Sequence, residues 1–201
     1  ARLAAEKRLF CSPQIEGTAV NLREYFSKMS GTTRGSPPRV SNGEILWSWI
    51  GAFLGIAAVA WVSQLFFEGL DRSLMIGSFG ASAVLVYGAV RSPLAQPRNL
   101  IGGHVLSAIV GVLCWKLLSQ HMWLAEAVAV ATSIAVMHAT RTLHPPGGAT
   151  ALIAVIGSPE IHKLGFLYVL LPATIAPLIL LAVALLVNNI PASRRYPEIW
   201  F

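Results

Sequence analysis

Two stretches of this chain bring hydroxyl groups, glycines and prolines together in patterns suited to holding a small anion. One is Gly77-Ser-Phe-Gly-Ala-Ser82, and the other is His144-Pro-Pro-Gly-Gly-Ala-Thr150. A helix N-terminus presents free N–H groups and a partial positive charge, which favour anions. Ser78, Ser82 and Thr150 add hydroxyl donors. The sequence therefore predicts binding of a small polar or anionic solute.

Four glycines in these stretches are candidate binding residues. Gly77, Gly80, Gly147 and Gly148 have no Cβ, so an anion could come close to the backbone N–H groups beside them. The alternative is that they let helices pack closely, as small residues do in membranes. The Pro-Pro pair before Gly147 argues against packing alone, because it breaks the chain and stiffens the entry to a helix.

His144 and Arg141 are the candidate residues with titratable or charged side chains. His144 can donate a hydrogen bond to an anion, carry a proton, or brace the broken backbone. Arg141 either attracts the anion at the mouth of the site or is a loop charge that sets orientation. His104 follows two glycines in an apolar segment and is expected to be a bonded structural residue.

Enzymatic chemistry is not expected from this sequence. It has no His/Cys cluster at zinc spacing, no phosphate-binding loop and no carboxylate pair placed for acid–base work. We therefore expect no metal and no cofactor. The net charge is +6, and seven of the fifteen Lys/Arg lie in residues 1–45; no basic patch interleaved with aromatic residues occurs elsewhere, so nucleic acid is not an expected partner.

The composition places these residues in a membrane. Of the 201 residues, 55% are hydrophobic and only 12% are charged, whereas about a quarter are charged in soluble domains. Several apolar runs approach or exceed the roughly 20 residues that a spanning helix needs. The lipid bilayer is therefore an expected partner. Broken backbone at membrane depth is tolerated only where protein or water satisfies it, so a break marks a candidate binding site.

We predict an all-α, polytopic transmembrane helical bundle. Residues 1–44 form a polar arm, in which 21–28 is either a short amphipathic helix on the membrane surface or part of a tether. Residues 45–190 form the transmembrane domain, and 191–201 a short tail. Six crossings are expected, the second interrupted at Gly77–Gly80 and the fifth short; the ranges are 46–67, 74–90, 100–119, 122–138, 148–157 and 164–187. The Lys/Arg bias places both termini on the cytoplasmic or stromal side.

An internal repeat divides the bundle. Gly80-Ala-Ser-Ala-Val-Leu85 and Gly148-Ala-Thr-Ala-Leu-Ile153 share one pattern, and each is followed by a Ser-Pro pair. Repeat one covers about 46–119 and repeat two about 122–187, so three crossings each would give the halves opposite orientations. Chance similarity between Gly/Ala-rich segments is the competing explanation. The repeat predicts two short helices that begin at Gly80 and Gly148 and face each other across the midplane.

Leu143-His-Pro-Pro-Gly-Gly-Ala-Thr-Ala-Leu152 resembles the motif that names the HPP family of integral membrane proteins. Similar stretches are Gly80-Ala-Ser-Ala-Val-Leu85, Ser92-Pro-Leu-Ala-Gln-Pro-Arg-Asn99 and Gly102-Gly-His104. The resemblance covers roughly 45–190 and leaves the arm outside. Members from plastid-bearing organisms and cyanobacteria are implicated in nitrite transport, so the resemblance implies nitrite as the leading substrate.

The function expected from these observations is transport of a small inorganic anion, nitrite first, through a midplane site between the two short helices. The alternative is a structural or accessory subunit of a larger membrane complex, without transport of its own. A homo-oligomer or a larger complex is a possible assembly. The expected location is a chloroplast inner envelope, another organelle membrane or a bacterial cytoplasmic membrane.

Overall fold

A computed structural model describes residues 22–29 and 38–201, apart from the side chains of Glu24, Leu70 and Ser73. The chain divides between Arg39 and Val40 into two units. Within the first unit the predicted short helix is present as α2 (Leu22–Lys28). The other predictions for the arm up to residue 37 fall outside the described residues.

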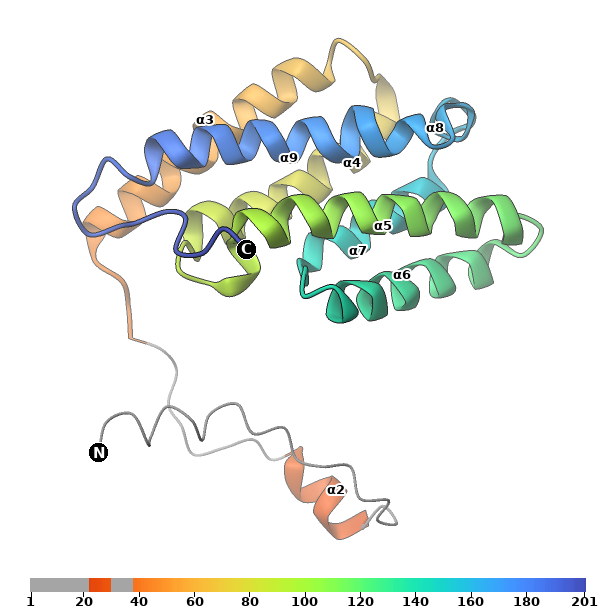
Figure 1. Cartoon of the computed structure of the whole chain (residues 1–201), viewed down its shortest axis with the longest axis horizontal. Helices are drawn as coiled ribbons and strands as arrows, with labels where there is room; N and C mark the ends of the chain where they lie inside the picture. The colour runs from red at the N-terminus through yellow and green to blue at the C-terminus, as the bar shows by residue number, and fades with distance from the viewer. Residues whose placement is uncertain (1–21, 30–37) are drawn as a thin grey trace. The chain divides into compact units, whose positions relative to one another are not determined.

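The second unit is a bundle in which successive α-helices, apart from the shortest, run in opposite directions and are joined by short connections (Figure 1). Every regular element in the described part of the chain is helical. A π-helical turn, η1 (Val84–Gly88), extends α4, and a 3₁₀ turn, η2 (Pro93–Ala95), precedes α5. The α-helices are α3 (Asn42–Ser63), α4 (Gly69–Ala83), α5 (Pro97–Leu118), α6 (Met122–Ala139), α7 (Pro145–Ile156), α8 (Pro159–Leu164) and α9 (Leu167–Val187).

Four helices of the described chain, α3, α5, α6 and α9, are long and apolar enough to cross a membrane. Two shorter apolar segments, 74–88 and 145–156, lie between them in the sequence. Large apolar side chains remain exposed on the outside of the bundle, among them Trp49, Phe53, Trp61, Leu117 and Leu186. Lipid contact explains this exposure, and the chain is an integral membrane protein.

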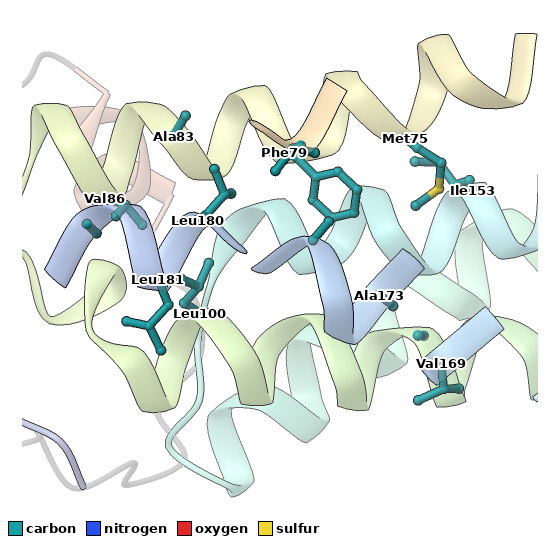
Figure 2. Packing of buried hydrophobic residues seen from close by; sticks show 14 of the residues in the cluster. Met75, Phe79, Ala83, Val86, Leu100, Ile153, Val169, Ala173, Leu180 and Leu181 are labelled. Carbon is teal, nitrogen blue, oxygen red and sulfur yellow. The ribbon is translucent and has the colours of Figure 1, made fainter. Parts of the chain in front are cut away.

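The predicted break at Gly77–Gly80 is wrong, because α4 is a continuous helix from Gly69 to Ala83. A glycine inside a helix costs only about 1 kcal/mol, far less than a proline. Met75 and Phe79 on the same helix are 0% and 1% exposed and pack into the main core (Figure 2). The close packing of these two side chains against the neighbouring helices offsets the cost of both glycines.

The predicted short helix at Gly148 is present, although it begins at Pro145 rather than at Gly148. Pro145 and Pro146 stand in its first turn, where a missing N–H costs little. Gly157 ends it, and the side chain of Ser158 then caps α8. The resulting α7 has 12 residues, or about 18 Å of helix.

Glycines set the distance between α5 and α7. A Cβ on Gly103 would lie 2.5 Å from the Cβ of His144, and one on Gly147 would lie 2.7 Å from the carbonyl oxygen of Gly103. A Cβ on Gly111 would lie 2.8 Å from the Cα of Ala151. Helix α7 therefore rests directly on the backbone of α5, which is the close packing that small residues allow in membranes.

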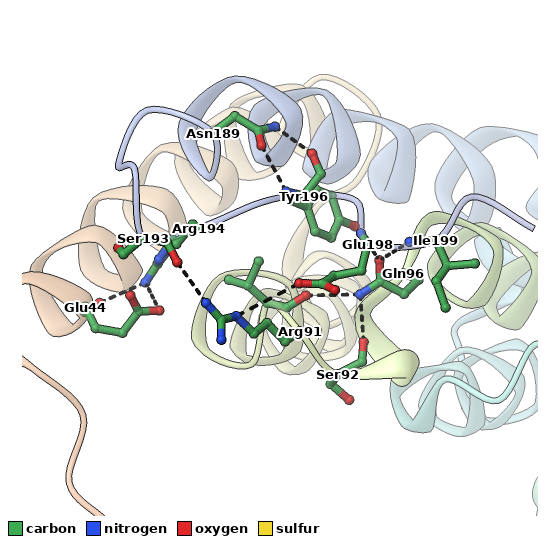
Figure 3. Close-up of polar contacts among 11 residues, drawn as sticks. Glu44, Arg91, Ser92, Gln96, Asn189, Ser193, Arg194, Tyr196, Glu198 and Ile199 are labelled. Atoms are coloured by element: carbon green, nitrogen blue, oxygen red, sulfur yellow. Dashed lines mark hydrogen bonds and ion pairs between the residues drawn. The ribbon is translucent and has the colours of Figure 1, made fainter. Parts of the chain in front are cut away.

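The C-terminal tail folds back over the end of the bundle where α3 and α5 begin (Figure 3). The guanidinium of Arg194 donates to the Glu44 carbonyl and to Ser48, and pairs with the Glu44 carboxylate at 2.8 Å. Tyr196 donates to the Ala95 carbonyl at 2.8 Å, and burial raises the pKa of its phenol. The tail thereby holds η2 in place.

Replacing Arg194 with methionine is expected to lower the free energy of unfolding by about 2–3 kcal/mol. The Arg194 side chain is only 2% exposed, so its loss leaves Glu44 and Ser48 without their buried partner. Thermal unfolding in detergent measures the change. Arg195→Met is the matched control, because the neighbouring arginine is exposed. Equal stability of the two variants would contradict this role of the tail.

Candidate functional site

Five side chains with hydroxyl or imidazole groups meet between α4, α5 and α7. We call them the buried polar cluster, and all are at most 3% exposed: Ser78, Ser82, His104, His144 and Thr150. Four of them are predicted binding residues, and His104 joins them from α5. A polar group inside a membrane protein is costly unless it is bonded, so such a cluster marks a candidate functional site.

Ser82 stands between the two histidines. Its Oγ lies 2.8 Å from Nε2 of His104 and 2.9 Å from Nε2 of His144. The two rings are 5.1 Å apart between centroids. Nδ1 of His104 lies 2.6 Å from the Thr150 hydroxyl, which in turn lies 3.1 Å from the hydroxyl of Ser78. The five side chains therefore form one continuous hydrogen-bonded chain.

The last bond of this chain fixes the direction of all the others. Nδ1 of His144 faces the Leu94 carbonyl at 2.8 Å, and a carbonyl can only accept, so His144 donates through Nδ1. In a neutral ring Nε2 of His144 must then accept the Ser82 proton, and Ser82 must accept from Nε2 of His104. The Thr150 hydroxyl donates to Nδ1 of His104. Every bond is satisfied with both histidines neutral.

Neighbouring residues hold the cluster in this geometry. The ring of Phe79 covers His104, with 5.5 Å between centroids. Tyr168 of α9 donates to the Thr150 carbonyl at 2.8 Å. Asn99 donates to the Leu143 carbonyl at 2.8 Å and so braces the chain just before His144. The cluster is closed on the sides formed by α4, α5 and α9.

The glycines of the two stretches have different surroundings. Gly147 lies against Gly103, so close packing explains it and no room remains there for a ligand. A Cβ on Gly77 or Gly80 would meet nothing within 4 Å, and one on Gly148 would meet only Val130, at 3.8 Å. Gly77 is exposed on the outside of α4. The predicted cradle of two opposed N-termini is wrong, because Gly80 lies inside a helix rather than at its start.

The two repeated motifs nevertheless meet. Ser82 and Thr150 occupy equivalent places in these two similar motifs, and their hydroxyls bind the two nitrogens of His104. His104 lies seven residues after Pro97, or about 10 Å along α5, which is roughly 33 Å long. The cluster therefore begins on the side of the midplane where α5 and α7 start, and not at the midplane itself, where the sequence predicts the site.

A basic hollow opens at that end of the bundle, which we call the basic mouth. It has a volume of about 260 Å³ and is lined by Gln96, Arg98, Asn99, Arg141 and the end of the tail. Arg98 donates through Nε to the Arg141 carbonyl at 3.0 Å. Neither arginine has a carboxylate partner among the described residues, so the basic mouth is positively charged. The predicted site residue Arg141 lies here, exposed, and not in the cluster.

The opposite end of the bundle has an acidic hollow, where Lys163 pairs with Glu160. It has a volume of about 580 Å³ and is lined by Glu68, Asp71 and Glu160. Asp71 accepts from the backbone N–H of Ser158 at 3.0 Å, and the one Ser158 hydroxyl proton is shared between Asp71 and Glu160. The hydrogen bond from Ser158 lowers the pKa of the Glu160 carboxyl. The basic mouth thus favours anions more than the acidic hollow does.

His104 is the cluster residue that sequence reasoning missed as a binding residue. Its signal was present, because Gly102-Gly103-His104 places a histidine beside two glycines in an apolar helix. Spacing along the chain cannot show that Ser82, Thr150 and His144 converge on it from two other helices. No group of three or more metal-ligating side chains is found within residues 22–29 and 38–201.

Comparison with known proteins agrees with this architecture. The chain is 43% identical over 181 residues to one transmembrane protein of Dictyostelium discoideum, and 42% identical over 202 residues to another. The alignments cover 89% and 98% of this chain, but 58% and 68% of those proteins. The chain thus spans about three fifths to two thirds of the relatives it matches. No solved structure matches it.

The family model for the HPP transmembrane region matches residues 37–197. This match takes in all the helices of the second unit, the cluster, the two arginines of the basic mouth and the tail up to residue 197. The resemblance found in the motif at Leu143–Leu152 is therefore confirmed over most of the chain, and the protein belongs to the HPP family of transmembrane proteins.

Proposed function

We propose that this protein is a transporter, not an enzyme, and that it moves a small inorganic anion across the membrane, with nitrite as the leading substrate. The observation that carries the proposal is the buried polar cluster. Hydroxyl and imidazole groups are suited to replace the water around a small anion of two or three oxygens, without a fixed charge that would hold it too tightly. Nitrite as the substrate rests on the family resemblance.

The arrangement of the helices supports two inverted halves. The second half of the bundle can be matched to the first by pairing α3 with α6, α4 with α7, and α5 with α9. Each observed contact between two of these helices then corresponds to another observed contact or to itself. The α3–α4 contact corresponds to α6–α7, and α3–α9 to α5–α6. The cluster joins residues of both halves, which is where transporters built from inverted repeats bind their substrates.

A rearrangement of the halves is part of this proposal. The cluster is buried and fully bonded, so an anion reaches it only when the helices around it, α4, α5 and α7, move relative to one another. We therefore favour a carrier with alternating access over an open pore. The same close packing is what favours the alternative, a membrane subunit without transport, and a flux measurement separates the two.

Uptake of nitrite into liposomes that contain the purified protein tests the proposal. We expect saturable uptake well above that of protein-free liposomes, and competition by other small planar anions. Chloride, which is spherical and lacks two or three acceptor oxygens in one plane, should compete weakly. Uptake equal to that of protein-free liposomes would overturn transport and leave the accessory subunit.

Arg141→Gly should raise the KM for nitrite by about 5- to 20-fold, because it removes one of two attracting charges at the basic mouth. The effect should shrink as salt is added. Arg141 has φ 58°, so glycine fits its backbone at least as well and folding should not suffer. Arg141→Lys is the control that keeps the charge. An unchanged KM in the glycine variant would show that Arg141 does not attract the anion.

A further inference from the structure

We propose that the protein carries one proton together with each anion, and that the proton travels on the relay formed by His104, Ser82 and His144. This inference rests on the proposed function and concerns what the same cluster does during transport. It begins from an unusual arrangement, in which one hydroxyl bridges the Nε2 atoms of two fully buried histidines.

The cluster holds spare acceptors for an added proton. Protonated His104 would donate through Nδ1 to Thr150, whose own proton then needs another acceptor. The Pro146 carbonyl lies 3.4 Å from the Thr150 hydroxyl and 3.1 Å from that of Ser78. Two hydroxyl rotations therefore accommodate a proton on His104 without leaving any donor unpaired.

The same holds for the other histidine. Protonated His144 would donate through Nε2 to Ser82, and the Ser82 proton then has the Ser78 carbonyl within 3.4 Å. Each histidine thus has a second arrangement of hydrogen bonds ready for its charged form. A cluster with only a structural role needs one arrangement of hydrogen bonds. This cluster has three, one with both histidines neutral and one for the protonated form of each histidine.

The transfer between the histidines conserves atoms and charge. The Nε2–H bond of His104 breaks as its proton forms a new O–H bond on Ser82. The original O–H bond of Ser82 breaks as its proton forms an N–H bond on Nε2 of His144. His104 is left neutral with its proton on Nδ1, and the positive charge has moved to His144, beside the basic end of the bundle.

No fixed charge competes with this proton. Tyr168 of α9 reaches the cluster only through the Thr150 carbonyl, and Tyr87 of η1 donates to Leu180. None of the charged or titratable side chains on the surrounding helices bonds to the cluster in the described chain: Glu44 of α3, Asp71 and Arg72 of α4, Arg98, Cys114 and Lys116 of α5, and Glu126 and His138 of α6.

The absence of a counter-charge is what couples the two ions. An unpaired charge buried in this place costs several kcal/mol, whether it is an imidazolium or an anion. An imidazolium beside a monovalent anion is neutral overall, so the pair enters at much lower cost than either ion alone. The anion and the proton are therefore expected to cross together, one of each.

The test is to measure nitrite uptake and internal acidification in the same liposomes. Protein-free liposomes give the background from nitrous acid that crosses the bilayer undissociated. We expect one proton per nitrite, and a rate that changes by less than about two-fold when a membrane potential is imposed with potassium and valinomycin. Nitrite uptake that carries net negative charge without acidification would overturn the relay and leave transport standing. No nitrite uptake at all would overturn the proposed function itself.

Two variants test the relay directly. His144→Gln keeps a donor for Leu94 and an acceptor for Ser82 but cannot hold a proton, and Ser82→Ala removes the bridge. Both should lose proton movement, and any nitrite uptake that remains should respond to the membrane potential. Ser133→Ala is the control, because the Ser133 hydroxyl is buried without a partner. Variants that still move one proton per nitrite would overturn the proposal.

Discussion

Replacing His104 with leucine should reduce nitrite uptake by at least about 100-fold. The leucine keeps an apolar side chain against Phe79 but removes both ring nitrogens. Ser82 and Thr150 then each lose a buried partner, at about 1–3 kcal/mol per group, and the two halves of the cluster are no longer connected. A loss of about 3 kcal/mol in stabilisation of the crossing anion corresponds to a factor of more than 100. Initial rates of uptake in liposomes measure it.

His121→Leu serves as the matched control. His121 is exposed at the start of α6, at the other end of the bundle, so this variant should transport like the unmodified protein. Size-exclusion profiles and helical circular dichroism should be the same for both variants. Uptake by His104→Leu within about two-fold of the control would show that the cluster is structural.

Substituting Gly111 with alanine should lower the free energy of unfolding by about 3 kcal/mol, at the upper end of the usual cost of overpacking. The new Cβ would lie 2.8 Å from the Cα of Ala151 and 2.8 Å from the Cβ of Ala154, and closer still to the Ala151 carbonyl. These neighbours include backbone atoms of α7, which cannot rotate away. Helix α7 must shift, and the cluster shifts with it. Thermal unfolding in detergent measures the loss.

The same substitution at Gly77 should have the opposite effect. A Cβ there meets nothing within 4 Å, so alanine should stabilise α4 by about 0.5–1 kcal/mol. Together the two variants distinguish a glycine needed for close helix packing, Gly111, from one that is not, Gly77. If Gly111→Ala were as stable as Gly77→Ala, the close approach of α5 and α7 would not hold in solution.

Hydropathy was sufficient to predict most of the helices. The third and fourth apolar runs correspond to α5 and α6 within three residues at each end, because Gln96-Pro97 and the turn before Met122 mark their limits. The prolines within α9 are tolerated, since hydropathy and packing outweigh the missing N–H groups. Helix α3 begins four residues before the predicted start, where Ser41 caps it through the Glu44 N–H.

The shape of the site was not predictable in the same way. A pair of glycines looks alike in sequence whether it lies in the first turn of a helix, as at Gly147–Gly148, or in the middle of one, as at Gly77 and Gly80. The difference comes from the prolines next to the first pair and from the burial of Phe79 between the second. The similarity of the two motifs pairs Ser82 with Thr150, but their common partner His104 is visible only in three dimensions.

This difference changes the chemistry of the site. Helix N-termini would supply fixed dipoles, which cannot take up or release a proton. The cluster supplies side chains instead, and two of its five members are histidines. The tail and the basic mouth lie at the same end as the Leu94 carbonyl that orients the cluster, so η2 links the surface to the buried site.

The most direct test of anion passage through the cluster replaces one hydroxyl group with a methyl group. Thr150→Val keeps the shape of the side chain and removes the hydroxyl that joins His104 to Ser78. Thr174→Val makes the same exchange in α9, where the hydroxyl bonds only to the Val169 carbonyl. In parallel liposome assays the first variant should take up nitrite at least about ten-fold more slowly than the second. Equal rates, with both proteins folded, would contradict transport through this cluster.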